Sequence, residues 1–115
     1  MSGFYPIRGE WFRMILSGEK GEEYRDIKPY YTKRFRTLGL LDVDGKPTGN
    51  EAEIVLRQGY SAKDPEITCR VKLRIGYGRR EWGAPGKQTY ILEILQIVSM
   101  RNCRTEKNRI EAARL

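Results

Sequence analysis

The sequence predicts one small α+β domain, in which about five to six strands form a strongly bent sheet or β-barrel with about two or three short helices beside it. Helix-type periodicity is confined to the first third of the chain, whereas strand-type alternation dominates the second half. Neither an internal repeat nor a linker divides the 115 residues, an ordinary length for a single domain. Because so few strands must enclose one core, we expect the sheet to curve strongly or to close.

The first third of the chain predicts a short strand followed by two helices. Pro6 limits segment 4–7 to a strand start or a sheet edge, because proline cannot donate a ladder hydrogen bond. Segment Glu10–Ser17 has apolar side chains at the one-turn spacing of an amphipathic helix. Gly18 follows as the expected left-handed helix stop. A second short helix is expected from about Pro29, since proline is well tolerated in a first turn.

The second half predicts strands separated by loops. Segment 41–50 is rich in turn residues and is expected to be a loop. Residues 52–57 alternate between apolar and polar, and residues 67–77 do so most clearly, with basic side chains facing outward. After the glycine-rich loop 76–87, residues 90–98 are apolar on both faces except at two positions, which indicates a central strand.

We therefore expect one domain over residues 1–100. Residues 101–115 are then a basic C-terminal tail that either forms a short helix or frays. No apolar run is long enough to span a membrane, and no signal-peptide pattern is present. These features predict a cytoplasmic protein without a membrane partner. The oligomeric state is open, with a monomer favoured.

The charge of the chain favours a polyanionic partner. Lys and Arg number 22 against 15 Asp and Glu, which gives a net charge of +7. A domain this basic attracts polyanions, of which nucleic acid is the commonest, so RNA or a nucleotide is the expected ligand. The alternative is that the charge serves solubility alone.

The chain has no histidine, which excludes the serine and cysteine nucleophile systems that need one, as well as histidine-ligated zinc. Cys69 and Cys103 have neither a CxxC nor a metal-ligand spacing, as is typical of a reducing compartment. By its alternation Cys69 is expected in the core, and Cys103 is expected to be a free thiol of the tail. We expect neither a metal nor a cofactor.

Segment Gly18–Arg25 is the most unusual part of the sequence, because it is strongly charged and lies between two apolar elements. In an extended backbone Glu23 and Arg25 lie on one face, and a bend at Gly21 would bring Lys20 to the same face. Such a cluster shifts the pKa values of its members and can bind an anion or position a water. The alternative is a solvated rim strand with weak surface ion pairs.

The spacing GxKxxExR, formed by Gly18, Lys20, Glu23 and Arg25 directly after a short helix, resembles the signature of the ASCH family (activating signal cointegrator homology). This family is a branch of the PUA-like β-barrels. The resemblance continues through segments 54–61, 67–77, 81–87 and 90–94, so that it covers about residues 4–98. It implies a small PUA-like barrel with a cleft that segment Gly18–Arg25 lines.

The resemblance also implies two activities. Members of the family are generally proposed to bind RNA, and some compact ones are amidohydrolases on acetylated cytidine or ribonucleases. In the amidohydrolases the lysine that matches Lys20 is catalytic, but a threonine stands where this chain has Glu23. The loop 76–87 is also shorter than in members that carry an acidic residue there, and Glu81 is its only carboxylate. Binding is therefore the expected function, with a hydrolase that uses Lys20 and Glu23 as the alternative.

Three more residues are candidates for ligand contact. Arg57 and Tyr60, near the end of one strand, could supply a phosphate contact and a stacking ring in the same cleft, although Tyr60 could equally cap the barrel. Trp82 in the glycine-rich loop could stack on a base or plug a barrel end. The outward cations of segment 67–77 form a stripe that could follow a phosphate backbone.

Overall fold

The computed structural model describes residues 3–103, which form a five-stranded mixed sheet with two α-helices. In chain order the elements are β1 (Tyr5–Pro6), α1 (Gly9–Leu16), β2 (Glu22–Arg25), α2 (Pro29–Thr37), β3 (Ala52–Arg57), β4 (Glu66–Gly76), a 3₁₀ turn (Arg80–Trp82) and β5 (Thr89–Arg101). The predicted tail beyond Arg104 lies outside the described residues. The strand β5 itself extends through Arg101, one residue past the expected domain boundary.

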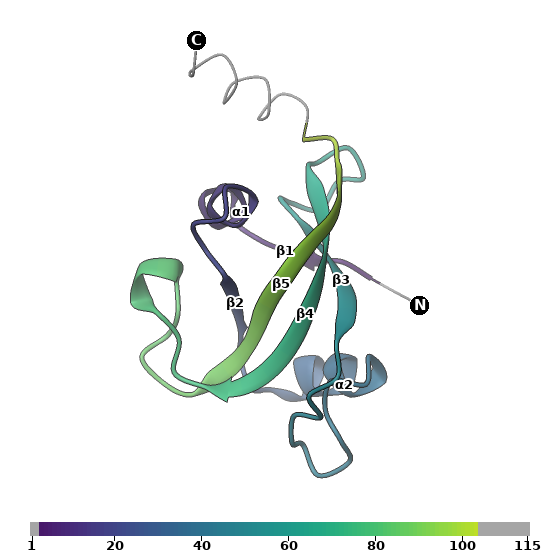
Figure 1. The fold of residues 1–115 in the computed structure, drawn as a ribbon, viewed down its shortest axis with the longest axis vertical. Helices are drawn as coiled ribbons and strands as arrows, with labels where there is room; N and C mark the ends of the chain where they lie inside the picture. Colours follow the sequence, from purple (N-terminus) through teal and green to yellow (C-terminus); the bar gives the residue numbers. More distant parts are fainter. Residues whose placement is uncertain (1–2, 104–115) are drawn as a thin grey trace.

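The strands lie in the order β1-β3-β4-β5-β2, so β1 and β2 are the two edges of the sheet. Only β1 and β3 are parallel, and the other neighbours are antiparallel. The long strands β4 and β5 bend together, with two register shifts in the first half of β4. Bulges of this kind bend a strand and increase its twist. The sheet thereby curls into a half-barrel, and the two helices lie near opposite ends of it (Figure 1).

The core fills the concave side of this sheet. Its helical contributions are Phe12 and Ile15 from α1 and Phe35 from α2, all of which are at most 2% exposed. Alternate residues of β4 complete it, and Cys69 among them is fully buried, as its alternation predicted. Cys103, which was expected in the tail, is buried and lies against the backbone of β4.

Two of the outward cations of β4, Arg70 and Arg74, are paired with carboxylates. Arg70 lies 3.7 Å from carboxylate oxygens of Glu51 and Glu53. Arg74 lies 2.7 Å from Glu22 and also contacts a carboxylate of β5. The expected phosphate track is therefore neutralised in part, at Arg70 and Arg74, by carboxylates that lie far from them in the sequence. No helix of residues 3–103 is long and apolar enough to cross a membrane.

Candidate functional site

The segment Gly18–Arg25 turns from α1 into the edge strand β2. Gly18 adopts φ +87°, the left-handed conformation that favours glycine and ends the helix. The amide of Lys20 then donates to the Met14 carbonyl oxygen over 2.9 Å. The Gly21 carbonyl accepts a hydrogen bond from the Ile94 amide on β5, which brings the chain into the sheet. These backbone bonds fix the path of the chain after α1 and, with it, the direction of the Lys20 side chain.

Lys20 is enclosed on all sides. Its side chain is 0% exposed, and its Nζ donates to the Trp82 carbonyl oxygen over 2.5 Å. The same ammonium lies 3.3 Å from Glu23 Oε1 and over the rings of Tyr24 and Trp11, at 4.6 and 5.4 Å from their centres. The segment is thus no solvated rim strand, because its lysine is a buried internal cation.

Glu23 bridges Lys20 and Arg25. Its Oε1 faces Lys20, and its Oε2 accepts a hydrogen bond from Arg25 Nη2 over 2.7 Å. Arg25 Nη2 also donates to the Pro6 carbonyl oxygen over 2.8 Å, and its Nη1 donates to the Tyr31 hydroxyl over 3.3 Å. The Lys20–Glu23–Arg25 cluster therefore carries two cations and one anion in a largely buried place, an excess of one positive charge.

Burial and ion pairing act in opposite directions on this cluster. Burial lowers the pKa of Lys20, and the neighbouring Glu23 carboxylate counteracts only part of that effect. Burial also works to lower the pKa of Arg25, but Glu23 and the Tyr31 hydroxyl outweigh it, so that the pKa of Arg25 is raised. Arg25 is thus a permanent cation of the site, whereas Lys20 is the cation whose charged form the site disfavours on balance.

A cavity of about 210 Å³, here called the first cavity, opens beside Glu23 and Arg25. Trp11 and Trp82 also line it, as do Tyr24, Gly83 and segment 6–8. Gly83 adopts φ +92°, and a Cβ there would lie 2.9 Å from the Trp11 ring, so glycine lets the loop pack against this indole. Lys20 does not line the first cavity, because it lies behind Glu23. The cavity thus offers a carboxylate, a guanidinium and aromatic walls.

A second cavity of about 610 Å³ shares segment 6–8 with the first cavity. Arg25 lines it too, together with Tyr31, Gln58, Gly59 and Tyr60. The Tyr60 ring is 78% exposed and packs edge-on against Phe4, with ring centres 6.3 Å apart. Tyr60 therefore lies near the site but lines a different cavity from Trp82.

Arg57 lies at neither cavity, although it was expected in the same cleft as Tyr60. Its Nε donates to Glu66 Oε1 over 3.0 Å, and its guanidinium stacks on the Phe4 ring at 3.8 Å. The antiparallel register pairs Arg57 with Glu66, so the carboxylate of the next strand holds this cation. The other predicted residues are brought together: Glu23, Arg25 and Trp82 line the first cavity, and Lys20 supports them from behind.

Sequence reasoning assigned no part in the site to Arg8, Trp11, Tyr31 or Gln58. Trp11 and Tyr31 were explained by helix packing, and each helix does pack its apolar side on the core. One feature of the sequence could have pointed to Trp11. It directly precedes Phe12, which is fully buried, so the Trp11 side chain leaves the helix in a different direction from the core residue. Arg8 and Gln58 lie in connections, where no periodicity predicts a direction.

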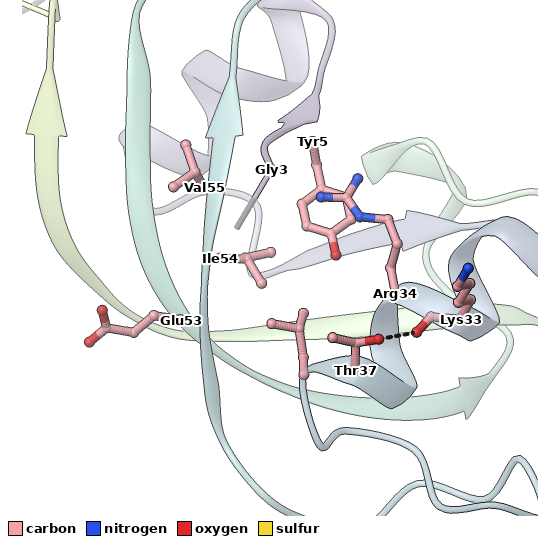
Figure 2. Close-up of a pocket in the computed structure, with 9 residues that line it drawn as sticks. Gly3, Tyr5, Lys33, Arg34, Thr37, Glu53, Ile54 and Val55 are labelled. Atoms are coloured by element: carbon pink, nitrogen blue, oxygen red, sulfur yellow. Dashed lines mark hydrogen bonds between the residues drawn. The ribbon is translucent and has the colours of Figure 1, made fainter. Parts of the chain in front are cut away.

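A further cavity of about 220 Å³ lies between α2 and β3, away from the predicted residues. Figure 2 shows the Arg34 guanidinium over the Tyr5 ring and Ile54 directed toward that ring, whereas Glu53 points away on the other side of β3. The Tyr5 hydroxyl is buried there without a hydrogen-bond partner among residues 3–103, and burial raises its pKa. The lining of this cavity between α2 and β3 is mainly aliphatic and aromatic carbon, unlike the lining of the first cavity.

Within the described part of the chain, no group of three or more acidic or cysteine side chains is arranged to hold a metal ion. Comparisons of the chain with protein-family models, with curated proteins and with solved structures find no match.

Proposed function

We propose that this protein is an ASCH-like domain of the PUA-like type that binds single-stranded RNA or a nucleotide in the first cavity. The observation that carries the proposal is the buried Glu23–Arg25 pair in the wall of a cavity that two tryptophans also line. Aromatic rings hold unstacked bases, and a carboxylate accepts hydrogen bonds from the amino groups on base edges. A cytoplasmic location agrees with such a ligand.

The charge of the site supports an anionic ligand. Lys20, Glu23 and Arg25 sum to one excess positive charge in a place with little solvent to screen it. Arg8, whose side chain is 81% exposed, adds a cation at the rim of the first cavity. A phosphate group would therefore be attracted to the same place as the base.

Binding is tested with short single-stranded RNA labelled with fluorescein, by anisotropy at several salt concentrations. We expect the affinity to fall as salt rises, because phosphate contacts release counterions. Trp82→Ala keeps the backbone carbonyl that holds Lys20 but removes the indole, so it should weaken binding about fivefold to hundredfold, the range for loss of one stacked base. Tyr77→Ala, at a 66% exposed tyrosine that lines neither cavity, is the matched control. Absence of binding at low salt refutes the proposal.

Hydrolysis is the second candidate function, favoured by the lowered pKa of Lys20, since a lysine that loses its proton readily can act as a base. Its geometry is less favourable, because Nζ lies behind Glu23 and under the Trp82 carbonyl. Contact with a substrate would require the loop 79–84 to move. The test compares the wild type with Lys20→Met on acylated cytidine and on RNA, by chromatography of the products. Equal turnover by both proteins eliminates a catalytic role for Lys20.

A further inference from the structure

The first and second cavities share one wall. Pro6, Ile7, Arg8 and Arg25 line both of them. The second cavity, at about 610 Å³, is nearly three times as large as the first, at about 210 Å³. A ligand that fills the first cavity therefore leaves the second cavity open to a further group attached to that ligand.

Two buried polar atoms, on residues that line these cavities, have no hydrogen-bond partner among residues 3–103. One is Arg25 Nε, a donor on a side chain that is only 9% exposed, and the other is Gln58 Oε1, an acceptor. A buried polar atom without a partner costs about 1–3 kcal/mol, and native proteins rarely leave one without a reason. Arg25 lines both cavities and Gln58 lines the second, but these two atoms are themselves buried, so a ligand reaches them only when the side chains rotate.

The remaining groups of the second cavity suit a nucleotide. Arg8 lies on the shared wall, and among residues 3–103 its one ion contact is a 3.9 Å approach to the exposed Glu10, a pair of little strength. Its guanidinium is thus available to a phosphate between the two cavities. The exposed ring of Tyr60 lines the second cavity, where a base could stack on it.

We propose that the second cavity takes the nucleotide adjacent to the one in the first cavity, with the phosphate that joins them at Arg8. This inference rests on the proposed function and makes it more specific. The ligand is then a strand of two or more nucleotides, and an isolated nucleoside or mononucleotide occupies only half of the site. Gln58 and Arg25 form part of the wall against which this second nucleotide lies.

The test compares ribonucleoside 5′-monophosphates with the matching 5′-phosphorylated dinucleotides by NMR titration of the labelled full chain, which measures weak as well as tight binding. We expect the dinucleotide to bind at least about fivefold more tightly, the lower end for stacking of one more base. In Tyr60→Ala the ratio of the two dissociation constants should fall to about one, because the added base loses its ring. Tyr60 is 78% exposed, so this variant keeps the core intact.

Arg8→Ala should reduce the same ratio and its dependence on salt, whereas Tyr77→Ala and Arg36→Ala, whose side chains line neither cavity, should keep it. Equal affinity for mononucleotides and dinucleotides in the wild type overturns this inference and leaves the proposed function standing. A ratio that persists in Tyr60→Ala also overturns it, because the gain then arises outside the second cavity. Failure of both ligands to bind refutes the proposed function as well.

Discussion

Replacement of Glu23 by glutamine would leave two buried cations beside a neutral amide. The Lys20 side chain is 0% exposed and that of Arg25 is 9% exposed, so water cannot take over from the lost carboxylate. Breaking a buried ion pair by removing one partner costs about 3–5 kcal/mol, because the remaining charge is left uncompensated. Glutamine still accepts one hydrogen bond, so we expect Glu23→Gln to lower the free energy of unfolding by about 3 kcal/mol, at the lower end of that range.

Replacement of Lys20 by methionine should cost less. Methionine fills a similar volume, and Glu23 keeps its 2.7 Å bond to Arg25. The variant loses the hydrogen bond to the Trp82 carbonyl. This leaves a partly buried acceptor without a partner, which costs about 1–3 kcal/mol of stability. This loss is offset because the ammonium no longer has to be buried, and apolar replacement of buried ions is often neutral. We expect a net cost of about 1 kcal/mol.

Equilibrium urea unfolding at neutral pH, followed by tryptophan fluorescence and circular dichroism, measures both variants and the Lys20→Met/Glu23→Gln double variant. The double variant lacks one of the two cations that Glu23 compensates. If uncompensated charge causes the cost of Glu23→Gln, the double variant is therefore more stable than the sum of the two single changes predicts. The reasoning is refuted if the two changes add within about 0.5 kcal/mol, the value for independent sites. It is also refuted if Lys20→Met costs as much as Glu23→Gln.

Three further predictions concern the backbone, a thiol and an amine. Gly18→Ala should lower the free energy of unfolding by about 1–2 kcal/mol in thermal denaturation, because alanine is disfavoured at φ +87°. A change smaller than the error of that measurement would contradict this role of the left-handed conformation. Burial, helped by Glu23, raises the pKa of Cys69 to about 12. Stability should therefore fall as the pH rises above 9, where the unfolded thiol ionises and the folded one does not, and the wild type should lose more than Cys69→Ala. Amine reagents should modify exposed Lys63 much faster than Lys20 in the native protein, and equal rates by mass spectrometry would show that Lys20 is accessible.

The strands and helices could be predicted from local patterns, in several cases because one side of the element is buried. The alternation of residues 52–57 corresponds to β3, and that of residues 67–77 corresponds to β4 within one residue at each end. The stop at Gly18 and the helix start at Pro29 depend on single residues with strong backbone preferences. In all these cases the cause of the structure lies within a few residues of its effect.

The enclosure of Lys20 could not be predicted in this way. Its hydrogen-bond acceptor, the Trp82 carbonyl, is 62 residues away in the sequence, in a loop without periodicity. The same is true of Arg57, which sequence reasoning assigned to a ligand because the register that pairs it with Glu66 was unknown. The sequence shows which residues carry charge and can form ion pairs. The register of the sheet determines which of these charged residues pair with each other and which stay available to a ligand.

The hydrogen bond from Arg25 to the Pro6 carbonyl joins the two edge strands, β2 and β1, which stand at opposite ends of the strand order. Local opening of either edge breaks this one bond, and a ligand that contacts Arg25 favours the state in which both edges are in place. Ligand binding should therefore slow amide hydrogen exchange in β1 and β2 together. Three strands separate these two segments in the sheet, and the Arg25 guanidinium, bonded to Pro6 and lying over the Tyr5 ring, makes their opening a shared event.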